Sequence, residues 1–148
     1  MGKIYERKLL TKARPMMAAD EQVEVVAMAK VGSMRANATR NLVAGVAAGI
    51  ASGGTVMVGL IQAEAYLILT DRQILIFQSV TGSPGKHLGT IPRVYAHPVD
   101  VRDGLLFLKF FLQVDGWTEM LKLTVPPMPP YLRKRGRQFI ESLGAVAR

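Results

Sequence analysis

The region from residue 65 to residue 125 consists of short apolar runs that are separated by turn signals. Residues 65–69 and 74–77 are rich in β-branched and aromatic side chains, and "TDRQ" lies between them. Asp71 in this segment can accept a hydrogen bond from the backbone that follows it, which favours a turn. Runs this short and this close together predict antiparallel strands joined by hairpins. The chain is therefore constrained to a sheet in which successive strands pair.

The clearest predicted hairpin is "LLFLKFFLQV" and "WTEMLKLTV", which flank Asp115-Gly116. An Asp-Gly pair between apolar runs is a strong signal for a two-residue turn. Earlier in the chain, "SVTGSPGKH" is expected to form a longer loop because Gly and Pro interrupt it. "HLGTIP" ends in proline and "VYAHPV" has one next to its end, which suits edge strands. "PPMPP" at residues 126–130 is expected to end the sheet.

Helices and one further strand are predicted outside this region. In "EQVEVVAMAKV" the apolar residues alternate with a period of two, which predicts a strand. Residues 1–19 combine apolar and basic residues at helical spacing, and residues 131–146 place Leu132, Phe139 and Leu143 on one helical face. Gly136 is expected to weaken the second helix by about 1 kcal/mol relative to alanine. At 148 residues the chain suits one domain. The predicted fold class is α+β, with an antiparallel meander and a closing C-terminal helix.

This order of elements resembles the bacterial pleckstrin-homology-like (PH-like) domains. The residues that carry the likeness are "AYLILTDRQILIF", which resembles the strand, T-[DN]-R turn and strand of that family, then "GTIPRV", the "DGW" hairpin and the helix "RGRQFIESL". The likeness covers roughly residues 20–146. It implies a β-sandwich or barrel of about seven strands in two near-orthogonal sheets, with a C-terminal capping helix, a short N-terminal helix and a helical insert after the first strand.

Members of that family mostly bind lipids, proteins or copies of themselves, so the resemblance implies a binding module and no enzyme. Lipid-binding members place basic residues in the connection after the first strand. The basic residues of this chain that stand there are Lys30, Arg35 and Arg40. The family's usual tryptophan is missing from the C-terminal helix, because the only Trp is Trp117.

A stretch without charged residues occupies positions 41–61, and the basic segment "GSMRANATR" separates it from the predicted first strand. It is long enough to span a bilayer of ~30 Å as a helix. A single span would separate the first strand from the rest of its sheet, which disfavours that interpretation. Gly45, Gly49 and Gly53 are four residues apart and would let another backbone approach closely, with Ile50 beside them. The stretch is interpreted as a packed helix or self-association surface, with a membrane-inserted hairpin or a spanning helix as alternatives.

The sequence offers no constellation for catalysis or for binding a metal or a cofactor. Residues 82–87 read "GSPGKH", in which His87 stands where a P-loop needs Ser or Thr, so a hairpin loop is expected. His87 and His97 lie on separate predicted strands with no close carboxylate pair. The chain has no cysteine, and its first residues lack the apolar region of a signal peptide. We therefore expect a cytoplasmic protein without a small-molecule substrate.

The net charge of +8 favours anionic partners. The densest cluster of basic residues is "RKRGR", in which Arg133, Lys134, Arg135 and Arg137 could contact an anionic lipid or an acidic partner. No aromatic side chains interleave with it beyond Tyr131, which disfavours nucleic acid. The sequence therefore predicts a non-enzymatic binding or scaffold module that acts through a protein partner or self-association, potentially at a membrane surface. The alternative is a small membrane-anchored subunit that inserts residues 41–61.

Overall fold

The computed structural model describes residues 3–33, 56–57, 62–117 and 120–147. The chain begins with helix α1 (Lys3–Ala13) and a 3-10 turn, η1 (Arg14–Met16). The strands are β1 (Val23–Ser33), β2 (Val56–Met57), β3 (Gln62–Thr70), β4 (Gln73–Val80), β5 (Ser83–Pro92), β6 (Ala96–Asp103), β7 (Leu108–Val114) and β8 (Leu121–Val125). A second 3-10 turn, η3 (Arg93–Tyr95), precedes β6, and helix α3 (Pro130–Ala147) follows β8. The predicted α+β class and both terminal helices are confirmed.

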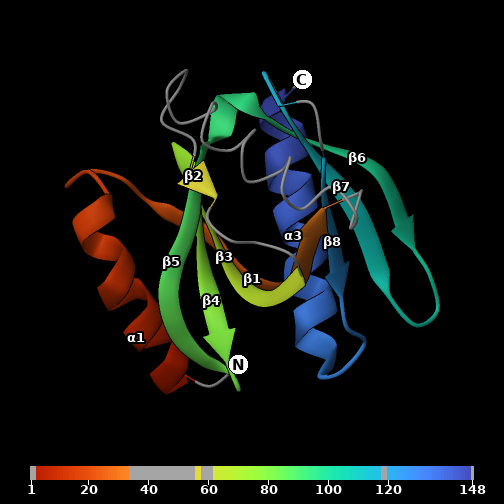
Figure 1. Ribbon diagram of the computed structural model, residues 1–148, viewed down its shortest axis with the longest axis horizontal. Helices are drawn as coiled ribbons and strands as arrows, with labels where there is room; N and C mark the ends of the chain where they lie inside the picture. The colour runs from red at the N-terminus through yellow and green to blue at the C-terminus, as the bar shows by residue number, and fades with distance from the viewer. Residues whose placement is uncertain (1–2, 34–55, 58–61, 118–119, 148) are drawn as a thin grey trace.

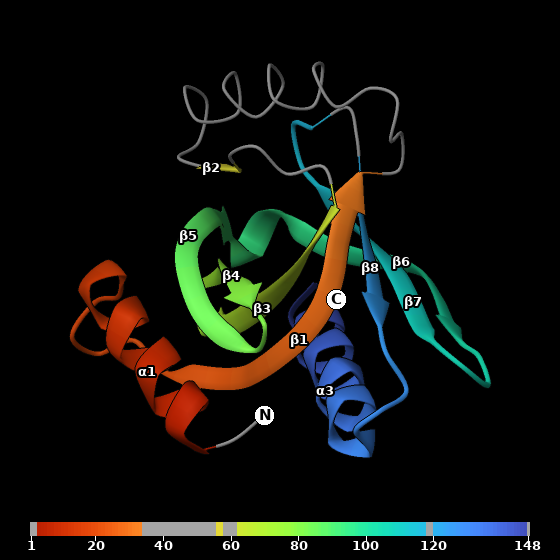
Figure 2. The same ribbon diagram turned by 60° about the horizontal axis from the view of Figure 1, so that its bottom comes forward.

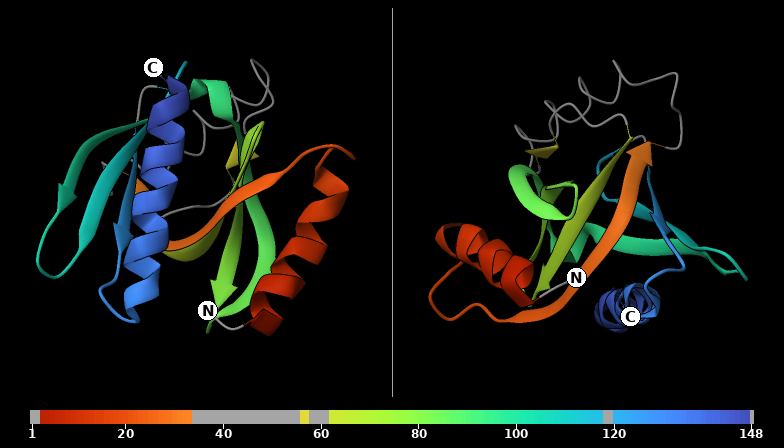
Figure 3. Two further views of the ribbon diagram at one scale, coloured as in Figure 1. Left: turned by 180° about the vertical axis from the view of Figure 1, so that it is seen from behind. Right: turned by 90° about the horizontal axis from the view of Figure 1, so that it is seen from below.

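The strands form one sheet in the order β2-β5-β4-β3-β1-β8-β7-β6, and all described pairs are antiparallel. β1 connects its two halves, because it pairs with β3 along nearly its whole length and with β8 only over Lys30–Ser33. Figure 2 shows β1 curving between the two groups of strands. Figure 3 shows α3 beside the opening that the curved sheet leaves. Apart from the two-residue β2, seven strands build this PH-like sheet.

The alternation in β1 divides the apolar side chains between two clusters. Val25, Ala27, Ala29 and Val31 point to the main core, which the two halves of the sheet and α3 enclose. Val26 points to the opposite face, where it joins a second cluster. The sequence prediction of alternating faces is therefore confirmed, because successive side chains of a strand leave on opposite sides.

Helix α1 covers the outer face of the sheet that β1, β3 and β4 present. Leu9 and Ala13 are fully buried there and pack on Tyr66 and Phe77. The side chains of Arg7, Lys8 and Lys12 are exposed, so the helix is amphipathic as predicted. Figure 1 places α1 at one side of the molecule and the β6–β7 hairpin at the other. α1 thus protects a face that would otherwise expose large apolar side chains.

One expected loop is instead a tight turn. β4 continues to Val80 and β5 begins at Ser83, so only Thr81 and Gly82 connect them. Both have positive φ, 50° and 89°, which is the conformation of the two central residues in a type I′ hairpin turn. The prediction of a longer loop over "SVTGSPGKH" was wrong, because Pro84 and Gly85 lie within the strand at irregular register.

The hairpin of β7 and β8 is confirmed, but its register differs from that of a two-residue Asp-Gly turn. Gly116 has φ 87°, and the Trp117 amide donates to the Val114 carbonyl at 3.0 Å. The strands then pair with Leu112 opposite Leu121, so additional residues lie in the connection. Trp117 consequently lies outside the strand and packs partly buried against the core.

Helix α3 closes the main core with Leu132, Phe139 and Leu143, as its spacing predicted. The sheet ends at Val125, before the proline-rich segment, and the Met128–Pro129 peptide bond is cis. Gly136 is buried against β7 and β8, where a Cβ atom would lie 3.0 Å from both Leu108 Cδ2 and Val125 Cγ2. Close approach therefore explains a glycine that helix propensity disfavours. None of the described helices is both long enough and apolar enough to cross a membrane.

Candidate docking surface

The turn between β6 and β7 carries three exposed apolar side chains, and one of them, Leu105, is the most exposed large apolar residue of the described chain. Leu105 is 98% exposed, Leu106 67% and Phe107 39%. The sequence analysis had assigned these residues to the following strand, but β7 begins only at Leu108. The amide of Gly104 donates to the Phe107 carbonyl at 3.0 Å, and this bond closes a four-residue turn. We call residues 104–107 the tip.

Arg133 in the first turns of α3 fixes the tip. Its guanidinium donates to the carbonyl oxygen of Gly104 and lies 3.5 Å from that of Leu105. The Arg133 Nε is 3.4 Å from an Asp103 carboxylate oxygen, and Arg137 Nε is 2.6 Å from the other. The hydrogen bond from Arg137 holds the pKa of Asp103 below its ordinary value. The tip is therefore attached to α3 through backbone carbonyls and one shared carboxylate.

A groove of about 420 Å³ lies next to the tip. Phe107 and Met128 line it from one side, and Met128 is itself 69% exposed. Lys30 and Glu64 line it as well, and these two residues are opposite each other in the β1–β3 pairing. The remaining lining is mostly apolar and comes from Met28, Ala29, Thr124, Pro126, Pro129 and Leu132. The tip, Met128 and this groove form what we call the apolar end.

The basic cluster of α3 is distributed over different sides of the helix. Arg133 and Arg137 are one turn apart and both reach Asp103. Arg135 points away from them, with Nη1 at 3.2 Å from Glu6 Oε1 and 3.3 Å from the Val26 carbonyl. Lys134 is exposed. Because successive helical residues are ~100° apart, five neighbouring positions cannot share one surface.

The other predicted contact residues fall on different parts of the chain. Lys30 is exposed on β1 and lines the groove. Arg35, Arg40, Gly45, Gly49, Ile50 and Gly53 lie outside the described residues. The apolar tip was missed, although the signal was visible in "DGLLF": the apolar run continues directly from a turn signal.

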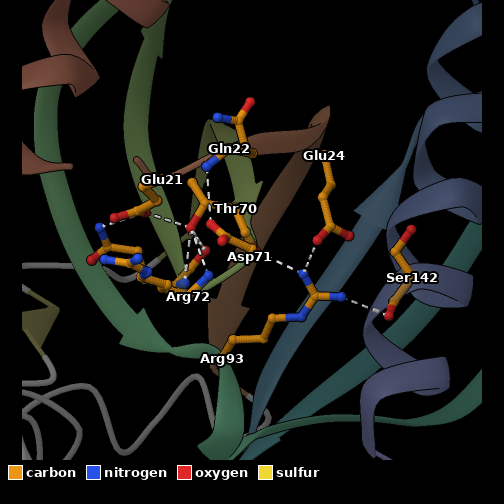
Figure 4. Close-up of polar contacts among 9 residues, drawn as sticks. Glu21, Gln22, Glu24, Thr70, Asp71, Arg72, Arg93 and Ser142 are labelled. Carbon is orange, nitrogen blue, oxygen red and sulfur yellow. Dashed lines mark hydrogen bonds and ion pairs between the residues drawn. The ribbon is translucent and has the colours of Figure 1, made fainter. Parts of the chain in front are cut away.

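A polar network occupies the end of β6 away from the tip (Figure 4). The Arg93 side chain is only 3% exposed, and Nη1 lies 2.7 Å from Glu24 Oε2 and 2.7 Å from the Thr70 carbonyl oxygen. Its Nη2 donates to the Ser142 carbonyl at 2.9 Å. Arg93 therefore connects β1, the end of β3 and the last turns of α3, and a buried charge is tolerated because it is paired.

Thr70 gives the "TDR" turn its geometry. Its hydroxyl oxygen accepts from the amides of Arg72 and Gln73 at 3.0 and 2.9 Å, and it lies 2.5 Å from Glu21 Oε2. Asp71 accepts from the Gln22 amide at 3.0 Å. The motif that carried the family resemblance is thus a structural device that holds the chain entering β1 against the β3–β4 turn.

The histidines and Tyr66, which lie elsewhere in the described part of the chain, have separate local partners. Burial lowers the pKa of His87, whose Nε2 is 2.8 Å from Thr90 Oγ1 and whose ring lies 5.3 Å from that of Phe77. His97 is 3.1 Å from an Asp115 carboxylate oxygen. Burial raises the pKa of Tyr66, which donates to the Gly82 carbonyl. Within the described ranges, His, Asp and Glu side chains form no group of three that could hold a metal ion.

Comparison with solved structures supports the fold. The chain aligns with a structure of Vav1 inhibited by an allosteric inhibitor, with a TM-score of 0.53 and 12% identity, over 95% of this chain and 33% of the other. An alignment to the truncated linker-DH/PH domains of p115-RhoGEF has a TM-score of 0.49 and 10% identity, over 94% and 34%. The chain thus spans about a third of these proteins. At this identity the likeness to Vav1 establishes the PH-like fold alone. No protein-family model and no curated sequence matches the chain.

Proposed function

We propose that the chain is a non-enzymatic, cytoplasmic binding module that docks on another macromolecule through its apolar end. One observation carries this proposal: Leu105 and Leu106 are exposed next to Phe107, and Phe107 and the exposed Met128 line one mostly apolar groove. Exposed apolar residues that occur singly are ordinary, whereas a contiguous patch beside a groove is typical of an interaction site. The partner classes that fit are a protein surface, including a second copy of this chain, and an anionic membrane.

The arrangement of the charged groups supports docking over chemistry at this surface. Asp103 forms ion pairs with Arg133 and Arg137, and Arg135 forms one with Glu6. These side chains therefore hold the tip and the helices in place, and they are engaged within the chain. The division of the basic cluster also argues against a continuous cationic path of the kind that follows a nucleic acid backbone.

Site-specific photocrosslinking in intact cells tests the proposal. A photoreactive residue would replace Leu106, and the matched control would replace Val94, which is equally exposed at 68% but lies beyond the other end of β6. We expect Leu106 adducts in excess of Val94 adducts, and their mass distinguishes a protein partner, a second copy and a lipid. Equal adduct yields at the two positions would refute docking through the apolar end.

A further inference from the structure

We propose that the tip enters the apolar region of an anionic lipid bilayer, with Leu105 and Leu106 as the inserted side chains. This inference rests on the proposed function and names its partner. It depends on the shape of the β6–β7 hairpin, on the hydrogen bonding of its turn and on the charges around it.

The hairpin projects beyond the rest of the sheet. Figure 1 shows β6 and β7 extending past β8 and ending in the turn at the lower right. At its end Leu105 is almost completely exposed, and Leu106 is two-thirds exposed. A protruding convex feature can enter a deformable lipid surface, whereas a protein partner would need a matching cavity. The projection therefore favours a bilayer.

Four of the eight backbone polar groups of the tip have hydrogen-bond partners inside the protein. The Gly104 amide and the Phe107 carbonyl bond to each other, and Arg133 supplies donors to the Gly104 and Leu105 carbonyls. Backbone groups that lack partners strongly oppose transfer into hydrocarbon. Because Arg133 supplies donors to two carbonyls that would otherwise need water, these groups keep their partners when the leucine side chains enter hydrocarbon.

The charges around the tip match an anionic surface. Apart from the Arg135–Glu6 pair, the cations on β6, β7 and α3 outnumber the carboxylates on these elements; the cations are Arg102, Lys109, Arg133, Lys134 and Arg137, and the carboxylates are Asp100, Asp103 and Glu141. Lys109 Nζ lies 5.6 Å from the centroid of the Phe107 ring, so one cation accompanies the apolar side chains directly. Each basic residue near an anionic leaflet strengthens binding by about fivefold.

The test uses the full chain with phosphatidylcholine vesicles, with or without 30% phosphatidylserine as an estimate of anionic leaflet charge. The chain contains no cysteine, so Leu105→Cys and Val94→Cys each accept a single environment-sensitive fluorophore. We expect a blue shift and brighter emission at position 105 on anionic vesicles and no change at position 94. Unchanged emission at position 105 on vesicles that bind the protein would overturn the inference.

Binding constants from vesicle sedimentation test the two components separately. Leu106→Ser should weaken binding about tenfold or more, as expected for loss of a buried leucine, while Val94→Ser leaves it unchanged. Lys109→Ala with Lys134→Ala should weaken binding to anionic vesicles by about twentyfold. Removing two exposed cations of α1, by Lys8→Ala with Lys12→Ala, should have a clearly smaller effect. Both pairs remove the same charge, the first from β7 and α3 and the second from α1, which lies across the molecule from the β6–β7 hairpin (Figure 1).

These outcomes distinguish the inference from the function on which it rests. Equal binding by Leu106→Ser and Val94→Ser would overturn insertion of the tip, even where another part of the chain binds lipid. If Leu106 then still crosslinked to protein in cells, the binding module would stand with a protein partner. If neither lipid nor protein contacted position 106, both proposals would fail. Thermal unfolding of each variant confirms that the changes at these exposed positions leave the fold intact.

Discussion

Replacing Gly136 with alanine should destabilise the protein, whereas the same replacement at Gly144 in the same helix should stabilise it. Both glycines lie in α3, so each change adds the same methyl group and the same gain in helix propensity. The surroundings differ. A Cβ atom at Gly136 would lie 3.0 Å from Leu108 Cδ2 and from Val125 Cγ2, whereas one at Gly144 would have nothing within 4 Å.

The expected magnitudes follow from two opposing effects. Alanine is favoured over glycine in a helix interior by up to about 1 kcal/mol. Adding a methyl group to a closely packed core costs about 1–3 kcal/mol. Gly136→Ala should therefore lower the free energy of unfolding by about 1 kcal/mol. Gly144→Ala, which meets no neighbour, should raise it by about 0.5–1 kcal/mol. The predicted difference corresponds to about 3–8 °C in melting temperature.

Urea unfolding followed by circular dichroism measures both variants, and unchanged m-values would show that the transition remains comparable. Leu108→Ala supplies a further control, because it removes one of the two side chains that crowd position 136. In that background Gly136→Ala should cost less than in the wild type, which a double-mutant cycle reports as a coupling energy. If Gly136→Ala and Gly144→Ala stabilise the protein equally, close packing of α3 on β7 and β8 does not explain Gly136.

Four further substitutions test the polar groups of the fold. In urea unfolding, Arg93→Met should lower the free energy of unfolding by about 2–4 kcal/mol, because the Thr70 carbonyl loses its donor. Glu24→Gln should lower it by about 1 kcal/mol or less, since Glu24 is 37% exposed. Equal losses for the two variants would refute this ranking. Thr70→Val should cost about 2 kcal/mol in the same assay by leaving two amides without their acceptor. Burial lowers the pKa of His87. The stability that the neutral ring contributes is therefore retained above about pH 6.5 and decreases as pH falls through the lowered pKa. On acidification, melting curves should show a smaller loss of melting temperature for His87→Gln than for the wild type.

The strands in the first half of the chain could be predicted because the side chains on their two faces pack in different surroundings. In β1 the period-two pattern assigns Val25 and Ala27 to the main core and Val26 to the cluster under α1, and the structure has this division. The turn at Thr81 and Gly82 could not be located in the same way. Gly and Pro are spread over the whole segment, and only the pairing of Val80 with Ser83 identifies which two residues turn.

The start of β7 was mispredicted for a different reason. "LLFLKFF" is continuously apolar, and an apolar run gives no sign of where pairing begins. The boundary depends on the bond between Gly104 and Phe107 and on Arg133, which is distant in sequence. A single sequence does not reveal such a contact. The split of the basic cluster, by contrast, follows from helix geometry and could have been predicted once residues 131–146 were assigned to a helix.

The two ends of β6 differ in how an energetically unfavourable side chain is accommodated. Next to its first residues, the buried guanidinium of Arg93 is matched by two carbonyls and a carboxylate within the chain. Beyond its last residues, the leucines of the tip stay in water, although Arg133 and Asp103 hold the turn beneath them. A rigid turn that keeps apolar side chains exposed gains free energy only when another apolar phase covers them. Because the charge of Arg93 is paired at one end of β6 and apolar area stays uncovered at the other, the tip is where binding can contribute most free energy.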